Sequence, residues 1–332
     1  MSSSDALSIA DTIEVLTRLG DVANSIVLIG GQALNFWAEQ FVGRAAALLA
    51  EAPYASKDID FCGTQAQLAL CARALNGRPT YQSEKTRSLC IGVVHYLDAN
   101  RKERELDFLS KPFGLEAERI WEMSFPATVK SQDGREATVR IMHPLHCFMS
   151  RVSNVGGLDK YHTDHGLRQM RASILCMRAF LQSQLDAGEH KVVTRLNERI
   201  FRFCLESEYA QKVFEQFGVE PFEAALHGDS RQPPMFNARR YPQMKQELAQ
   251  HRNERRQLEA RRKGSTVAPG DYVFVSEGEV GGQRVAYLTD AEGTEVVIRP
   301  WKGLPDLEEG ASVRLEADGR VVLLAIDMSR GR

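Results

Sequence analysis

The sequence predicts an α+β protein: a mixed sheet with packed helices, then a helical domain, then a small β-barrel of the SH3 or OB type. Three observations favour this order. Apolar β-branched runs alternate with helical patterns up to residue 143, helical spacing alone continues to residue 232, and short strands between glycine-rich turns follow residue 266. We therefore expect domains at residues 1–143, 144–232 and 266–332, with a basic helical linker at 233–265.

Length and composition favour a modular, folded protein. The 332 residues exceed one ordinary domain, and 43% hydrophobic with 26% charged residues exclude wholesale disorder. The net charge of -2 indicates no particular partner, and the six cysteines, which form no CxxC pair, are expected to be free buried thiols. No stretch has the pattern of a secretory signal or a membrane span, which predicts a cytoplasmic protein without a membrane partner.

The chain begins with a predicted helix, strand and helix. Residues 8–19 carry apolar side chains at helical spacing. Residues 25–29 form a short unbroken apolar run, typical of a buried strand, which stops at the turn Gly30-Gly31. Residues 32–41 then suit a helix packed on that strand.

Further strands complete the predicted sheet. Residues 58–61 form one strand and are followed by a helix at 65–75. Two more strands are expected at 89–96 and 105–109, and a last one at 138–142. A mixed sheet with helices against it follows.

The second half is predicted to be helical and then β-rich. Helical patterns cover residues 167–185, 192–207 and 208–217, and the pair Pro233-Pro234 ends this part. Residues 239–263 carry nine lysines or arginines against three glutamates and are expected to form a solvated basic helix. Five strands are expected after it, at 272–275, 285–288, 295–298, 313–315 and 321–326.

The chemistry centres on paired acids. Residues two apart in a strand point to the same face, so Asp58 and Asp60 present two carboxylates while Ile59 and Phe61 face the core. Magnesium binds through one or two such carboxylates together with substrate phosphates. The pair therefore indicates phosphate chemistry.

Two more features join this pair. The Gly30-Gly31 turn before a helix lets phosphate approach amides at the helix N-terminus. Asp107, on an otherwise apolar strand, is a candidate to orient or deprotonate an attacking hydroxyl. The alternative is that Asp107 only pairs with Arg104 or Lys111 at a strand end.

The order Gly30-Gly31, Asp58-Ile59-Asp60 and Asp107 resembles the motif order of the DNA polymerase β-like nucleotidyltransferase superfamily, and most closely its AbiEii/MenT-like group. The resemblance covers roughly residues 8–185. It implies a nucleotidyltransferase-type fold, a nucleoside triphosphate (NTP) substrate, and two magnesium ions held by Asp58, Asp60 and Asp107. That group includes toxins that transfer nucleotides to RNA, so a toxin-like activity and an antitoxin partner are also implied.

The match has departures and open points. Gln32 stands where many relatives have serine or threonine after the glycines. A basic residue on the first helix of the second half would neutralise the triphosphate; Arg151 is the nearest candidate and Lys160 a weaker one, with a helix-surface position as the alternative for Arg151. Gly30, Gly31, Gln32, Lys57 and Arg151 are thus the predicted nucleotide-binding residues.

Other motifs have ordinary interpretations. The HxxH pairs His143/His146 and His162/His165 match zinc spacing, but no cysteine completes a finger and we expect no zinc site. The basic stretch 239–263, with the barrel, is either a solvated linker or an RNA or DNA backbone footprint. Four aromatic residues of the barrel either stack bases or fill its core: Tyr272, Phe274, Tyr287 and Trp301.

The leading hypothesis is a magnesium-dependent nucleotidyltransferase that moves a nucleoside monophosphate from an NTP to an acceptor hydroxyl, with RNA as the favoured acceptor. The rival is a nucleic-acid-binding accessory protein of a mobile element with a degenerate nucleotidyltransferase domain. A third hypothesis, transfer to a small molecule, is less attractive because of the large C-terminal appendage.

Overall fold

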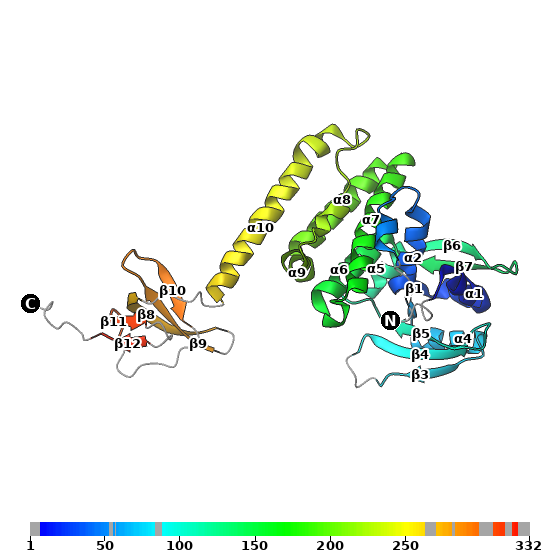
Figure 1. Cartoon of the computed structure of the whole chain (residues 1–332), viewed down its shortest axis with the longest axis horizontal. Coiled ribbons are helices and arrows are strands. Elements are labelled where there is room, and N and C mark those ends of the chain that lie inside the picture. The colour runs from blue at the N-terminus through cyan, green and yellow to red at the C-terminus, as the bar shows by residue number, and fades with distance from the viewer. Residues whose placement is uncertain are drawn as a thin grey trace, which may run out of the picture. The chain divides into compact units, whose positions relative to one another are not determined.

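The computed structural model describes residues 7–52, 56, 58–83, 88–262, 270–280, 283–298, 308–315 and 321–324. The chain divides into two compact units, Met1–Lys245 and Gln246–Arg332. Figure 1 shows an α+β protein with one sheet in each unit and most of the helices in the first. Within the described residues, no helix is both long and apolar enough to cross a membrane.

The first unit is built on a seven-stranded mixed sheet in the order β3-β4-β5-β2-β1-β7-β6. β2 pairs with β5 and β1 with β7 in parallel, and the other neighbours are antiparallel. The strands are β1 (Val27–Ile29), β2 (Ile59–Cys62), β3 (Arg78–Tyr81), β4 (Cys90–Leu97), β5 (Glu103–Leu109), β6 (Phe125–Lys130) and β7 (Glu136–Ile141).

Helices pack on this sheet and on one another. Figure 1 shows the long helices α7 and α8 lying side by side in the green part of the chain. Ser8 and Thr64 start α1 and α4 with capping boxes, which satisfy amides that the first helical turn leaves unpaired. The helices are α1 (Ile9–Leu19), α2 (Gly30–Phe41), α3 (Leu48–Glu51), α4 (Gln65–Ala74), α5 (Ala117–Met123), α6 (Pro144–Gly157), α7 (Asp164–Asp186), α8 (His190–Glu206) and α9 (Glu208–Phe217).

The alternation of strand side chains separates the core from the polar face of the sheet. Phe61 on β2 and Phe108 on β5 are fully buried, with ring centroids 5.6 Å apart. The residues next to them in the chain, Asp60 and Asp107, therefore point to the opposite face. On α2, the Trp37 indole donates a 2.8 Å hydrogen bond to the Met142 carbonyl, which ties this helix to the segment that leads into α6.

The basic stretch is helical, as expected. α10 (Tyr241–Arg262) follows a π-helical turn, Phe236–Arg240, and its first residue stacks on the rings of Phe222 and His227 at 5.2 and 4.2 Å between centroids. Met244 is also fully buried. The beginning of this helix is thus anchored by packing and is not solvated on every side.

The second unit contains a five-stranded antiparallel sheet in the order β10-β9-β8-β11-β12. All five predicted strands are present. Closure into a barrel stays a prediction, because β10 and β12 are edge strands in the described part of this sheet. The strands are β8 (Gly270–Val280), β9 (Gln283–Thr289), β10 (Glu295–Ile298), β11 (Ser312–Leu315) and β12 (Val321–Leu323).

Candidate functional site

The Gly30-Gly31 turn places the start of α2 against an acidic residue of β2. Gly30 has φ +70°, and a Cβ at this position would collide with the Asp60 carboxylate. The Gly31 amide donates a hydrogen bond to that carboxylate. α2 has no side-chain cap of its own, so Asp60 supplies the negative charge that a helix N-terminus favours. Glycine is needed at position 30 for both its backbone conformation and the space it leaves.

Asp60 and Asp107 are aligned on adjacent parallel strands. In the pairing of β2 with β5, Asp60 is the register partner of Asp107. Asp58 lies immediately before β2 and is exposed, rather than inside the strand as the sequence suggested. The three predicted acids therefore lie close together, two on the interior strands β2 and β5 and one on the loop that leads into β2.

The electrostatics of this acidic cluster are unusual. Burial, followed by the repulsion of Asp58, raises the pKa of Asp60 from 3.8 to about 6, although Arg151, Lys160 and the Gly31 amide oppose the shift. Burial, followed by the repulsion of Asp60 and Asp58, raises the pKa of Asp107 from 3.8 to about 7. The two carboxyl groups therefore titrate together near neutral pH. Perturbed groups of this kind gather at functional sites.

Two positive side chains face these acids. Arg151 on α6 is only 7% exposed, so the helix-surface alternative is wrong. Its Nη1 donates a 2.9 Å hydrogen bond to Gln169 Oε1 on α7, and its Nε has no partner within the described structure. Lys160, which follows α6 in a short 3-10 turn (Asp159–Tyr161), is exposed and acts electrostatically on both Asp60 and Asp107. Both basic candidates thus belong to one cluster with the acids.

A cavity of about 270 Å³ opens beside this cluster. Ile29, Gly30, Asp60, Arg151 and Lys160 line part of it. The sequence did not single out the other lining residues. Those on α6 have the spacing of ordinary buried residues, and the rest lie at strand ends and in the segments between elements. The other lining residues are Ser88, Leu89, Cys90, Leu109, Pro112, Phe113, Ser150, Asn154, Leu158 and Tyr161.

Gln32 is placed differently from the other predicted residues. Its side chain is fully buried and donates to the carbonyls of Leu7 and Ser56 at 3.3 and 3.1 Å. This side chain therefore holds the segment before β2 and is not a lining group of the cavity. Lys57 lies outside the described residues.

The alternative partners of Asp107 are engaged elsewhere. Arg104 makes an ion pair with Asp98 at 3.0 Å, and Lys111 makes one with Glu116 at 3.1 Å. Their charges are thus already compensated. The raised pKa of Asp107 agrees with a carboxyl group that lacks a compensating ion pair.

The donor chemistry of the site fits magnesium. Asp58, Asp60 and Asp107 offer hard carboxylate oxygens, and a divalent cation would relieve the repulsion that raises two of their pKa values. Within the described residues, no group of three or more acidic, histidine or cysteine side chains is arranged so that it could hold a metal ion. Magnesium, however, commonly uses one or two carboxylates and takes its remaining ligands from phosphates and water.

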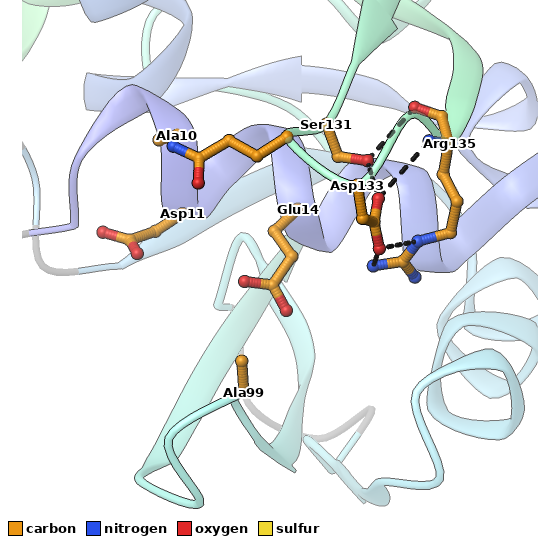
Figure 2. A pocket seen from close by; sticks show the side chains of 8 residues that line it. Ala10, Asp11, Glu14, Ala99, Ser131, Asp133 and Arg135 are labelled. Carbon is orange, nitrogen blue, oxygen red and sulfur yellow. Dashed lines mark hydrogen bonds and ion pairs between the residues drawn. The ribbon is translucent and has the colours of Figure 1, made fainter.

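A larger cavity of about 370 Å³ lies away from the acidic cluster (Figure 2). Figure 2 shows Asp11 and Glu14 of α1 opposite Asp133 and Arg135 of the β6–β7 turn. Asp11 accepts hydrogen bonds from the Ser8 amide and hydroxyl at 2.8 and 2.7 Å, and Asp133 accepts one from Arg135 Nε at 2.7 Å. Asp11 and Asp133 thus already have local partners, so we place the candidate site at the smaller cavity.

The histidine motifs occupy other positions. The rings of His143 and His146 are buried 6.1 Å apart, and burial lowers their pKa values to about 3 and about 4, so both are neutral. His143 Nδ1 accepts the Leu145 amide and caps α6. His162 Nε2 lies 2.8 Å from the Val155 carbonyl. The first pair therefore contributes to packing and capping at the start of α6.

Two of the four aromatic residues of the second unit belong to its core. Tyr272 and Phe274 on β8 are 9% and 5% exposed and pack in one apolar cluster. Their interpretation as core residues is confirmed. Tyr287 on β9 is only partly buried, and Trp301 lies outside the described residues. The six cysteines are free, four of them buried and two, Cys62 and Cys90, partly buried.

Comparisons of this chain with family models, with curated proteins and with solved structures gave no match. The site must therefore be interpreted from its own geometry.

Proposed function

We propose that this protein is a magnesium-dependent nucleotidyltransferase that moves a nucleoside monophosphate from an NTP to an acceptor hydroxyl and releases pyrophosphate. The observation that carries the proposal is the alignment of Asp60 with Asp107 on adjacent parallel strands, beside the start of α2 and opposite Arg151 and Lys160. Asp60 lines one cavity together with the cations Arg151 and Lys160, and Asp58 and Asp107 act electrostatically on Asp60 or with it, so the site can take both a metal cation and an anion. A magnesium nucleotide supplies both.

Each side chain has a role that its surroundings support. Asp58, Asp60 and Asp107 would hold the two magnesium ions, which supply charge neutralisation at the attacking and leaving oxygens. Arg151 and Lys160, which both line the cavity, neutralise the phosphates. Asp107 is the candidate to orient the attacking hydroxyl or accept its proton.

The proposal also covers the type of fold, the barrel, the location of the protein and its partners. The first unit has a nucleotidyltransferase-type arrangement of the AbiEii/MenT-like kind, the second sheet closes as a small SH3- or OB-like barrel, and the protein acts in the cytoplasm. RNA is the preferred acceptor, because the basic stretch 239–263 would neutralise a nucleic-acid backbone. An antitoxin protein is the proposed regulator of such an activity.

Incubation of the full-length protein with each labelled NTP, magnesium and total RNA tests this proposal. Label should reach RNA with the wild-type protein and with Asp21→Asn, a surface control far in sequence from the acids. Asp60→Asn and Asp107→Asn should reduce transfer by at least a hundredfold, the lower end of what proton transfer and metal positioning contribute, roughly a hundredfold to ten-thousandfold. Absence of label in RNA, protein and small molecules for all four NTPs would contradict the proposal.

A second candidate function is a nucleic-acid-binding accessory protein with a degenerate catalytic domain. The basic composition of α10 is the observation that favours it. Two changes separate the candidates: Asp58→Ala with Asp60→Ala, and deletion of residues 239–332. If the biological effect survives the first change and is lost with the second, the binding function is correct.

A further inference from the structure

One side of α6 presents polar side chains to the cavity beside Asp60. Ser150 and Asn154 lie four residues apart and therefore on the same face of the helix. They are only 2% and 6% exposed, and both line the cavity. Within the described residues, neither the Ser150 hydroxyl nor the Asn154 amide has a protein partner, and neither is among the fully enclosed polar atoms that lack one, so both reach the open space of the cavity. Two buried polar side chains thus face a cavity without partners.

Such groups are costly unless something satisfies them. Buried polar side chains in folded proteins nearly always have hydrogen-bond partners, and exceptions indicate a ligand or bound water. Some buried polar side chains of the same helical region are satisfied within the protein. Asn197 on α8, for example, donates to the Leu226 carbonyl and accepts from the Leu226 amide at 3.0 and 2.9 Å. The Ser153 hydroxyl on α6 also lacks a partner within the described residues, but Ser153 does not line the cavity. Ser150 and Asn154 differ from it because they line the cavity, where a ligand can reach them.

The rest of the cavity lining defines the ligand chemistry. Arg151 and Lys160 contribute positive charge, whereas Leu109, Pro112 and Phe113 contribute apolar surface. The ring of Phe113 is held against that of Tyr209 on α9 at 5.1 Å between centroids. A volume of about 270 Å³ lies close to the lower limit of small-molecule sites, roughly 300–1,000 Å³. The matching ligand is compact, anionic in one part, and flat with a hydrogen-bonding edge in another.

We propose that Ser150 and Asn154 bind the nucleoside half of the NTP, with the Asn154 amide pairing with the edge of the base and Phe113 contacting its face. This inference rests on the proposed function. A carboxamide offers a donor and an acceptor side by side, and each base has an edge with its own pattern of donors and acceptors. A base with the wrong pattern leaves the buried amide unpaired, so Asn154 determines which nucleotide is accepted.

The test compares two probes bound to the full-length protein in magnesium, by titration calorimetry: the four NTPs, and inorganic tripolyphosphate, which has no nucleoside. The variants are Asn154→Ala, Ser150→Ala and Ser153→Ala. Ser153 is a matched control, because it is a fully buried serine of the same helix whose hydroxyl has no partner and which is not a lining residue of the cavity. Thermal unfolding of each variant checks that it is folded.

We expect Asn154→Ala to weaken binding of the preferred NTP about tenfold, to reduce the preference among the four, and to leave tripolyphosphate affinity unchanged. Ser150→Ala should weaken NTP binding about threefold, and Ser153→Ala should have no effect. An equal loss for tripolyphosphate, or unchanged NTP preference in Asn154→Ala, would overturn this inference and leave the proposed function intact. If the wild-type protein binds tripolyphosphate but discriminates among no NTPs, this inference alone fails. If it binds neither probe, the proposed function fails as well.

Discussion

Asp60 and Asp107 are register partners across the parallel pair β2–β5, so two carboxyl groups that are distant in the sequence share one position on the sheet. Burial and the repulsion of neighbouring carboxylates keep the pKa values of both far above 3.8, at about 6 and about 7. This relationship leads to predictions about stability, metal binding and catalysis.

In metal-free protein, ionisation of this pair should cost stability. Both folded-state pKa values exceed the unfolded value of 3.8, so the native state binds more protons between about pH 4 and pH 7. Stability from this source is present below pH 4 and is lost as the pH rises through 6 and 7. The melting temperature of Asp107→Asn should therefore rise relative to that of the wild type as the pH increases from 5 to 8. Each kcal/mol of stability that the wild type loses should add roughly 2–4 °C to this difference. If the difference in melting temperature between the two proteins in EDTA were the same at every pH, the coupled pair would be contradicted.

Magnesium binding should depend on the same two carboxyl groups, but it should become stronger as the pH rises and they ionise. The metal needs ionised carboxylates, so binding at low pH must displace protons. We expect magnesium to raise the melting temperature at pH 8 and to have little effect at pH 5. Asp60→Asn should lose the effect at pH 8, whereas the surface variant Asp21→Asn should retain it. A magnesium effect of equal size at both pH values would contradict these ligands.

Gly30→Ala should be more harmful than an ordinary substitution at a left-handed glycine. Gly30 and Gly20 both have positive φ, +70° and +57°, but nothing lies within 4 Å of a Cβ at Gly20, whereas one at Gly30 meets the Asp60 carboxylate. Gly20→Ala should cost about 1 kcal/mol of stability. Gly30→Ala should cost more and also abolish the magnesium effect on melting. Equal losses in both variants would mean that Asp60 simply moves aside.

Arg151 is expected to bind phosphate through its planar guanidinium. Arg151→Lys keeps the charge but cannot span Gln169 and a phosphate as the guanidinium does. We expect both Arg151→Lys and Arg151→Met to weaken tripolyphosphate binding, with the larger loss, about tenfold or more, in the methionine variant. Lys212→Met, on the surface of α9, is the control. Unchanged affinity in Arg151→Met would remove this residue from the site.

The basic segment should contribute to nucleic-acid affinity through its charge. Arg239 and Lys245 are exposed, and reversal of either to glutamate should weaken binding of RNA uniformly across sequences. Each reversal should also reduce the slope of log affinity against log salt by about one. Lys191→Glu, an exposed position on α8, should change neither quantity. An unchanged salt slope in Arg239→Glu and Lys245→Glu would assign the segment a linker role.

The sequence was informative where a local pattern decides the structure. The apolar run before Gly30-Gly31 predicted β1, and alternation around Ile59 predicted the face on which Asp60 lies. The strand β3 and the hairpin strand β6 were missed because the first is exposed and contains Pro79, while the second alternates half-buried and exposed positions without a strong apolar run. Helix α5, with only seven residues, is too short for periodicity to identify.

The acids of the candidate site could be predicted from the sequence, but the residues of the cavity wall on α6 could not. Carboxylates on apolar strands stand out in a sequence, as Asp60 and Asp107 did. Ser150 and Asn154 have the spacing of ordinary buried residues on α6, and only the cavity distinguishes them. Gln32 was expected at the phosphates because of its place after the glycines, but its side chain holds the carbonyls of Leu7 and Ser56. Long-range pairing, which no local pattern encodes, decided each of these cases.

The position of Arg151 has a consequence for any attempt to divide the protein. A fragment that ends at residue 143 would carry Asp58, Asp60 and Asp107 but neither Arg151 nor Lys160, the two cations that oppose their charge. Repulsion would then act on the acids without compensation, on strands that have lost the neighbouring helix α6. The natural unit of function is therefore the sheet together with the helices that follow it, and a split version would regain its charge balance only when the two pieces reassociate.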